Sequence, residues 1–343
     1  MKTLAIETSC DDTSLALVNY EDWSFKVEQL LAYSQIQEHQ KFWGVVPELA
    51  SRLHSEKIIA LLQTIWFDEI QKVDFISVTT QPGLPGSLVV GKTVAYELGA
   101  FFGKEVVSVH HIVGHIFSIL LERKPEELSF PLVILTASGG HNDIYLIEKR
   151  EDAESSQDFG SFEFSGFRIT KVGRTLDDAA GECFDKVSRM LGGPYPGGLW
   201  ISQKASLGKP NPLVQFKRIF LAHEKFEFSF SGMKSQVSFL LEHLERDWIA
   251  LTDELVCDIA YEFQEAVVEV LSKKLIQAGE HFGAKALALA GGVSANTRLC
   301  NAIPELLNKK QLACPFFIPV KKVYSTDNGA MIGLAGLLTK MEV

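Results

Sequence analysis

Two histidines four residues apart, His111 and His115, are the residues whose spacing most directly suggests chemistry. On an α-helix this spacing puts both imidazoles on one face, where they are able to bind one metal ion. Asp327 is the candidate third ligand, because it lies where a strand is expected to lead into a helix. Two imidazoles and one carboxylate suit iron or zinc and leave positions open for a substrate. Two simpler interpretations stay open: the histidines only pack, and Asp327 only caps a helix.

The histidine pair differs from the zinc-protease signature, because Ile112 occupies the place of the glutamate that follows the first histidine in H-E-x-x-H. Peptide hydrolysis is therefore disfavoured. The sequence also has no Gly-x-Ser-x-Gly elbow around a candidate serine. Residues 86–93 match the letters of the Walker A pattern, but they fall almost entirely within the expected helix at 87–102, so no P-loop is expected there. Covalent serine catalysis and P-loop chemistry are disfavoured as well.

Glycine-rich turns form a second group of candidates. Residues 138–140 are Ser-Gly-Gly directly after an expected strand, and residues 291–296 are Gly-Gly-Val-Ser-Ala-Asn before an expected helix. Backbone N–H groups that converge in such turns bind phosphate without a lysine. Asn296 is able either to cap the helix or to bond a sugar or base. A plain hairpin and a plain strand-to-helix turn are the open alternatives.

An acidic segment at residues 177–186 is the third candidate. Asp178, Glu182 and Asp185 fall on one helix face, where they repel each other unless a cation or hydroxyl group lies opposite. A solvated helix face is the alternative. Downstream, the Tyr-Pro-Gly-Gly bend that ends at Gly198 either approaches a ligand or only turns the chain.

The elements expected to position these residues occur twice in the same order: three strands, then helix, strand, helix, strand, helix. The first half has expected strands at 3–8, 14–18, 27–33, 75–79 and 106–109 and helices at 47–70, 87–102 and 111–122. The second half has expected strands at 132–136, 144–148, 162–171, 286–290 and 316–319 and helices at 258–278, 296–307 and 328–339. This repetition predicts an α/β protein of two similar lobes with a cleft between them.

The predicted domain boundaries follow from the repeat. The first lobe is expected at residues 1–126, with 327–343 packing back onto it, and the second at 127–326. In the second lobe about a hundred residues separate the third strand from the next repeated helix, far more than an ordinary loop. A mainly helical insertion is therefore expected at about 173–257.

The charge of the chain is uneven. The 343 residues carry a formal net charge of −10, which argues against indiscriminate binding of nucleic acid. Residues 168–234, however, contain eleven basic and six acidic side chains. This surplus indicates either a footprint for a phosphate backbone or a solvated face with dispersed charges.

The remaining composition indicates a cytoplasmic protein that does not enter a membrane. The five cysteines are scattered and never have Cys-x-x-Cys spacing, so neither a disulfide framework nor a thiolate zinc site is expected. No signal peptide is recognisable, and no apolar run approaches the roughly 20 residues of a membrane-spanning helix.

Several ordered motifs make the chain similar to the TsaD family of tRNA threonylcarbamoyladenosine transferases, formerly called O-sialoglycoprotein endopeptidases. They begin with Ile-Glu-Thr-Ser-Cys-Asp-Asp-Thr-Ser at 6–14 and Gly-Val-Val-Pro-Glu-Leu-Ala-Ser-Arg at 44–52 and include the histidine helix. Further matching segments lie at 82–88, 138–141, 177–186, 228–232, 291–296 and 326–331. Trp43 and Gln81 depart from this pattern, because glycine is usual at both positions.

The resemblance implies a two-lobed actin, hexokinase and Hsp70-like (ASKHA) fold. It also implies transfer of a threonylcarbamoyl group from threonylcarbamoyl-AMP to N6 of the adenosine beside the anticodon in tRNAs that read codons beginning with A. Such an enzyme is a metal-dependent acyltransferase that releases AMP. The alternative within the same fold is an ATP-binding or ATP-hydrolysing switch without acyl transfer.

The resemblance also implies roles for individual residues. A divalent metal, iron rather than zinc, is expected at His111, His115 and Asp327. Substrate contacts are expected at Thr136, Ala137, Ser138, Gly139, Gly140, Asp185, Gly198 and Asn296. Independently of the resemblance, Asp11 and Asp12 in the first hairpin are the candidates for a catalytic base, and each could equally organise a phosphate or a partner's magnesium ion. The expected partners are the tRNA anticodon loop, a paralogous TsaB-like subunit and a small TsaE-like ATPase.

Overall fold

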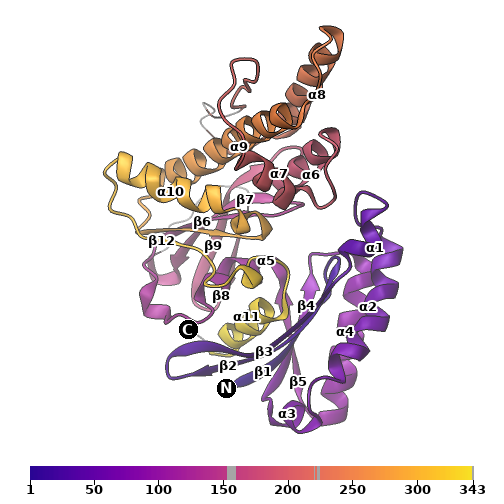
Figure 1. Cartoon of the computed structure of the whole chain (residues 1–343). Helices are drawn as coiled ribbons and strands as arrows, with labels where there is room; N and C mark the ends of the chain where they lie inside the picture. The colour runs from indigo at the N-terminus through magenta and orange to yellow at the C-terminus, as the bar shows by residue number, and fades with distance from the viewer. Residues whose placement is uncertain (153–159, 220, 222–224, 342–343) are drawn as a thin grey trace. The chain divides into compact units, whose positions relative to one another are not determined.

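A computed structural model describes residues 1–152, 160–219, 221 and 225–341. Glu224 of the basic stretch and the last two residues of the predicted 327–343 segment lie outside the described residues. The chain divides into two compact units (Figure 1). Unit 1 comprises residues 1–129, 163–167 and 319–343, and unit 2 comprises residues 130–162 and 168–318.

Unit 1 is built on a five-stranded sheet in the order β3-β2-β1-β4-β5. Its strands are β1 (Lys2–Glu7), β2 (Asp12–Glu21), β3 (Ser24–Ser34), β4 (Phe75–Gln81) and β5 (Glu105–His110). β1, β2 and β3 are antiparallel neighbours, whereas β4 is parallel to both β1 and β5. The carboxyl ends of β1, β4 and β5 therefore meet at one edge of the sheet.

The helices of unit 1 cover this sheet. They are α1 (Ile36–Gln40), α2 (Pro47–Leu62), α3 (Phe67–Lys72), α4 (Pro85–Phe102), α5 (His111–Phe117) and α11 (Gly329–Met341). α11 is almost entirely buried and packs on β1 and β2, so the end of the described chain returns to its beginning (Figure 1). Proline in the first turn of α2 and of α4 suits positions whose N–H has no helical partner.

Unit 2 repeats this strand arrangement. Its sheet has the order β10-β9-β7-β6-β11-β12, with β8 beside β9. The strands are β6 (Leu132–Ala137), β7 (Asn142–Lys149), β8 (Ser161–Phe164), β9 (Phe167–Thr175), β10 (Phe226–Phe228), β11 (Ala286–Ala290) and β12 (Phe316–Phe317). As in unit 1, two antiparallel strands adjoin parallel ones, with β6 parallel to β11 and β11 parallel to β12. The predicted duplication is confirmed.

The predicted insertion is mainly helical, with β10 as its only described strand. It contains α6 (Ala180–Met190), α7 (Gly197–Ala205) and α8 (Ser231–Arg246), and it precedes α9 (Asp253–His281) and α10 (Thr297–Lys309). One apolar cluster joins these helices to the sheet of unit 2. The substrate-contact residues expected from the sequence all lie in this unit.

Two predicted helices differ from the structure. The helix predicted at 47–70 is two helices, α2 and α3, because the chain turns at 63–66 before Phe67. The helix predicted at 111–122 ends at Phe117 and continues only as a 3-10 turn, Ser118–Leu120. Among the described helices, none combines the length and the apolar character needed to cross a membrane.

Candidate functional site

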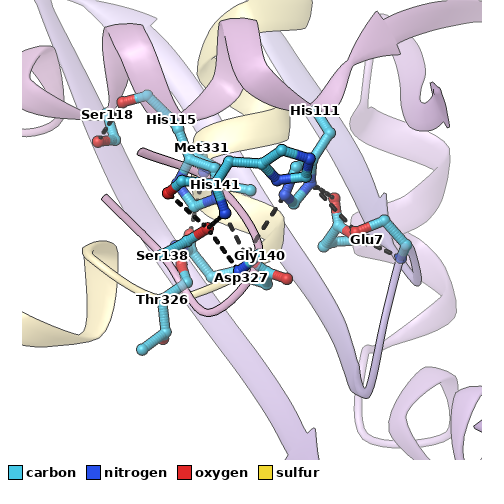
Figure 2. Close-up of polar contacts among 12 residues, drawn as sticks. Glu7, His111, His115, Ser118, Ser138, Gly140, His141, Thr326, Asp327 and Met331 are labelled. Carbon is cyan, nitrogen blue, oxygen red and sulfur yellow. Dashed lines mark hydrogen bonds and ion pairs between the residues drawn. The ribbon is translucent and has the colours of Figure 1, made fainter. Parts of the chain in front are cut away.

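The three predicted metal ligands come together in unit 1. α5 follows β5 directly and presents His111 and His115 on one face, with ring centroids 4.6 Å apart. Asp327 Oδ1 lies 3.4 Å from His111 Nε2 and 3.0 Å from His115 Nε2 (Figure 2). One ligand atom from each of the three residues falls within 4.8 Å of the others. This donor set fits one transition-metal ion.

The junction before α11 explains why Asp327 is available. Asn328 caps the helix, since its Oδ1 accepts from Met331 N at 3.0 Å and its Nδ2 donates to Thr326 O at 2.7 Å. The backbone N–H of Gly329 donates to Ser14 Oγ at 2.9 Å, which anchors the junction on β2. The sequence left open that Asp327 only caps the helix, but Asn328 is the residue that caps it. The Asp327 carboxylate instead faces the histidines.

Glu7 orients His111, a role that the sequence analysis missed. Its carboxylate, fully buried at the end of β1, accepts from Ser9 N at 2.5 Å and from Thr79 Oγ1. Oε2 of Glu7 also lies 3.2 Å from His111 Nδ1. Figure 2 draws this contact as a dashed line. Because a carboxylate only accepts, Nδ1 carries the proton and Nε2 remains the ligand atom. A glutamate within an otherwise apolar buried strand was the available sequence signal.

The charges of this cluster are strongly coupled. Burial opposes ionisation of His111, but the carboxylates of Asp327 and Glu7 outweigh burial and raise the pKa of His111 well above its usual value. Burial would raise the pKa of Asp327, yet the two histidines lower it. The pKa of Glu7 is lowered against burial by His111. Both acids are thus ionised, and the cluster favours a bound cation.

Glu7→Gln is expected to weaken metal binding about 10- to 100-fold, as is usual for loss of a group that orients a histidine ligand. The glutamine fits the same space, but its NH2 group facing Nδ1 would favour the tautomer with the proton on Nε2. Titration of the metal-free protein with Fe2+ or Zn2+ measures the change. Glu56→Gln, on the exposed side of α2, is the matched control. Equal affinity of the Glu7→Gln protein and the parent would contradict the orienting role.

The two candidate bases lie at the start of β2 in unit 1. Burial and the neighbouring Asp11 raise the pKa of Asp12 to about 7, although Ser34 opposes this. Burial also raises the pKa of Asp11, against a hydrogen bond from Cys10. His54 fixes the surrounding loop through Thr13 Oγ1 at 2.8 Å and Cys10 O at 2.9 Å. A carboxyl group that titrates near neutral pH suits general-base catalysis.

Asp12→Asn is expected to stabilise the metal-free protein at alkaline pH. Because the folded-state pKa of Asp12 is raised from 3.8 to about 7, ionisation makes folding less favourable as pH rises through this window. The free energy of unfolding of the variant should therefore exceed that of the parent by up to about 4 kcal/mol above pH 7. Below pH 4 the two free energies should become similar. Urea unfolding between pH 4 and pH 8 measures the difference. A constant difference across this range would exclude a raised pKa of Asp12.

In unit 2, the turn after β6 is exposed at both glycines. Ser138 closes it: its N–H donates to His141 O at 2.8 Å, and its Oγ accepts from Gly140 N and His141 N at 3.3 and 3.2 Å. Added Cβ atoms at Gly139 and Gly140 would meet nothing within 4 Å, so a ligand is able to approach the backbone here. Thr136 and Ala137, the last residues of β6, are buried beneath the turn.

The strand-to-helix turn of unit 2 is tightly fitted. Gly291 has φ +84°, and a Cβ on it would lie 2.5 Å from Ala137 O. Asn296 caps α10, since its Oδ1 accepts from Leu299 N at 3.0 Å. The capping role weighed from the sequence is therefore present, and both expected substrate turns adjoin the same end of the β6 and β11 pair.

In the acidic segment at 177–186, Asp178 precedes α6, so it does not share a helix face with Glu182 and Asp185 as predicted. The cation expected opposite these carboxylates is a lysine of the same segment. Lys186 Nζ lies 2.6 Å from Asp178 and 2.9 Å from Glu182. Asp185 Oδ1 accepts from Gly197 N at 2.6 Å and so joins α6 to the first turn of α7. Gly198, next along α7, meets nothing within 4 Å of an added Cβ. Asp185 and Gly198 thus belong to one local unit.

Many basic side chains of the stretch at 168–234 form ion pairs within the protein. At least six of its eleven basic side chains pair with carboxylates, namely Lys171, Arg174, Lys186, Lys204, Lys209 and Arg218. These pairs reduce the positive potential available to a phosphate backbone. Both interpretations of the stretch, a footprint for a phosphate backbone and a solvated face with dispersed charges, stay predictions.

Trp43, one of the two departures from the family pattern, adopts a φ of +56°. Side chains rarely adopt this left-handed conformation, whereas glycine does so without strain. The backbone at this position therefore suits glycine, the residue that the family resemblance leads us to expect there.

Solved structures of low sequence identity share the fold. HypF from T. kodakarensis has a TM-score of 0.58 at 14% identity and aligns with 99% of this chain, which covers 48% of HypF. Component A of (R)-2-hydroxyglutaryl-CoA dehydratase from Acidaminococcus fermentans has a TM-score of 0.51 at 14% identity, with 100% and 99% of the two chains aligned. A ROK family protein from Streptococcus pneumoniae has a TM-score of 0.51 at 11% identity, with 98% and 97% aligned. The predicted actin, hexokinase and Hsp70-like fold is confirmed.

Sequence relatives are closer. A protein from Staphylococcus epidermidis named tRNA N6-adenosine threonylcarbamoyltransferase is 38% identical over 336 residues, which are 97% of this chain and 90% of that protein. Proteins of the same name from Bdellovibrio bacteriovorus and Bacillus licheniformis are each 39% identical, over 98% and 97% of this chain and 92% and 90% of their own lengths. The TsaD family model matches residues 26–334. The chain therefore belongs to the TsaD family of tRNA N6-adenosine threonylcarbamoyltransferases.

Proposed function

We propose that this transferase moves the threonylcarbamoyl group from threonylcarbamoyl-AMP to N6 of the adenosine beside the anticodon, in tRNAs that read codons beginning with A. AMP is the leaving group. The observation that carries the proposal is the cluster of His111, His115 and Asp327 in a chain that belongs to the TsaD family. A nucleotide switch without acyl transfer has no need of this ligand set, and the family membership does not favour it.

His111, His115 and Asp327 are proposed to hold one divalent metal ion, iron rather than zinc. Two imidazoles and one carboxylate leave coordination positions open, as in non-haem iron sites. A metal ion bound there would act as a Lewis acid towards the acyl group and orient its threonyl part. Glu7 supports this assignment, because it holds His111 with Nε2 directed at Asp327.

The adenylate is proposed to bind to unit 2. Thr136, Ala137, Ser138, Gly139 and Gly140 would form one side of its site, and Asp185, Gly198 and Asn296 would complete it. The exposed backbone of Gly139 and Gly140 supports close approach of a phosphate. Binding along the adenylate fixes the acyl group for attack, and such positioning supplies much of the rate of a two-substrate reaction.

The attacking amine is a weak nucleophile, because its lone pair is delocalised into the adenine ring. Attack on the carbamoyl carbon forms the new C–N bond, and loss of AMP breaks the bond to the phosphate oxygen. The amine must also lose a proton, and Asp11 and Asp12 are the proposed acceptors. The pKa of about 7 at Asp12 supports this role.

The proposed macromolecular partners are the tRNA anticodon loop, a TsaB-like paralogue and a small TsaE-like ATPase. A base in a single-stranded loop is able to leave its stack and enter a pocket, which suits chemistry on an exocyclic amine. We propose a cytoplasmic location, where tRNA is available.

The proposal is tested by measuring AMP release from threonylcarbamoyl-AMP with and without tRNA, together with elemental analysis of the freshly purified protein. Modified adenosine is measured in the recovered tRNA by mass spectrometry. We expect tRNA-dependent AMP release, matching modified adenosine and about one metal ion per chain. The two partner proteins are added in a parallel series. ATP hydrolysis by this chain alone, with no modified tRNA in either series, would favour the switch instead.

A further inference from the structure

Three polar side chains from three helices of unit 2 meet in a closed network. Asn296 Nδ2, at the start of α10, donates to Ser202 Oγ on α7 at 3.1 Å and to Gln264 Oε1 on α9 at 3.0 Å. Ser202 Oγ donates in turn to Gln264 Oε1 at 2.8 Å. Gln264 thus accepts from both other members of the network.

Gln264 is unusual for its place in α9. Its side chain is only 6% exposed, and its sequence neighbours Phe263, Ala266 and Val267 belong to the apolar core of unit 2. A buried amide is costly unless its polar atoms are bonded. The two bonds accepted by Oε1 offset this cost, so the geometry of Gln264 is tied to that of Asn296 and Ser202.

The network and a helix-capping bond together hold the side chain of Asn296, and one lone pair of Oδ1 stays available for a ligand. Its Oδ1 accepts from Leu299 N at 3.0 Å, while its Nδ2 makes the two bonds to Ser202 and Gln264. Both ends of the side-chain amide are therefore engaged within the protein. This arrangement makes Asn296 the fixed end of the turn at 291–296.

The network also reaches the other part of the proposed adenylate site. Ser202 follows Gly198 by one helical turn of α7, and the first turn of α7 is bonded to Asp185 through Gly197 N. α7 is thus hydrogen-bonded to α6 at Gly197. At Ser202, one turn later, it is hydrogen-bonded to α9 and to the start of α10. Hydrogen bonds and one short helix connect Asp185, Gly198 and Asn296.

We infer that Gln264 is a positioning residue that sets the distance between the first turn of α7 and the 291–296 turn, and so the fit of the adenylate. The inference rests on the proposed function. Gln264 makes no proposed contact with the nucleotide and would act on it through Asn296 and through Ser202, which lies one helical turn after Gly198. Loss of Gln264 should weaken binding of the nucleotide. The rate of the chemical step and the metal content of the proposed site in unit 1 should not change.

The test compares Gln264→Leu with Gln264→Glu in the full chain. Leucine removes the acceptor, whereas glutamate keeps an acceptor oxygen in either ionisation state. We expect Gln264→Leu to raise the Kd for AMP, measured by calorimetry, and the KM for threonylcarbamoyl-AMP about 10-fold or more. kcat should change less than about twofold, as expected when only binding is lost. Gln264→Glu should remain close to the parent, as should Gln203→Leu, which makes the same change at an exposed position of α7.

Several outcomes would overturn the inference. These are a parental Kd in Gln264→Leu, equal impairment of the leucine and glutamate variants, or a loss confined to kcat or metal content. If Gln264→Leu does not fold, Ser202→Ala removes two of the three bonds and should raise the Kd several-fold. A parent that binds no AMP would reject the proposed adenylate site and the inference together, whereas AMP binding that is insensitive to Gln264 would reject the inference alone.

Discussion

Replacing His111 by alanine is expected to remove the bound metal and to lower threonylcarbamoyl transfer by more than about 100-fold. Loss of a residue that only orients a ligand costs about 10- to 100-fold, so loss of the ligand itself should exceed this range. His115 and Asp327 alone offer two ligand atoms, too few for tight binding of a transition metal. Elemental analysis and the rate of AMP release measure the two effects.

The fold of the His111→Ala protein should survive, because this imidazole retains some exposure and the apolar cluster of the unit 1 sheet does not include it. Circular dichroism and thermal unfolding check this expectation. His243→Ala, which removes an exposed imidazole from α8, is the matched control and should keep parental metal content and rate. Full tRNA modification by a folded, metal-free His111→Ala protein would reject the proposed role of the metal.

Gly291→Ala is expected to destabilise the protein by at least about 3 kcal/mol. The backbone there has φ +84° and ψ 167°, a conformation that is almost restricted to glycine. The new Cβ would also overlap the carbonyl oxygen of Ala137, so β6 or the turn must shift. The midpoint of urea unfolding and the Kd for AMP measure the consequences for stability and for the proposed site.

Gly292→Ala is the matched control, since a Cβ at Gly292 meets nothing within 4 Å and its φ is not positive. Its stability should stay within about 1 kcal/mol of the parent. If both variants unfold at the same urea concentration, the close packing of Gly291 on β6 cannot be important for stability.

The sequence predicted those features of the candidate metal site that depend on the spacing of residues along the chain. α5 begins at His111, so both histidines are helical. Residues four apart on a helix share a face, and the sequence shows this spacing directly. The pairing with Asp327 was inferred from its place between a strand and a helix, and the family resemblance supported it. The structure brings the three residues together as the sequence analysis expected.

Side-chain contacts between segments that are distant in the chain could not be predicted from the sequence. Glu7 looked like an interruption of an apolar strand, and only the parallel pairing of β1 and β4 brings Thr79 to its carboxylate. Gln264 lies within the helix predicted at 258–278, but its hydrogen-bond partners lie on other helices or at their ends. Such bonds depend on tertiary packing, for which a single sequence carries no periodic signal.

The fold was predicted well where hydrophobic periodicity was strong and less well at helix ends. The strand order repeats as expected in both units. The predicted helix at 47–70 continued past Leu62, whereas the chain turns at 63–66 and buries Ile65 there. The limits of helices depend on capping and packing, which periodicity does not encode.

The return of α11 to the first sheet has a consequence for biosynthesis. During translation, β1 and β2 leave the ribosome long before the helix that covers them, because the whole of unit 2 is made in between. An apolar sheet face that waits in this way is exposed to aggregation and to chaperones. The three proposed metal ligands become a complete set only after Asp327 has been added, so insertion of the proposed ion would be a late event in the maturation of the nascent polypeptide.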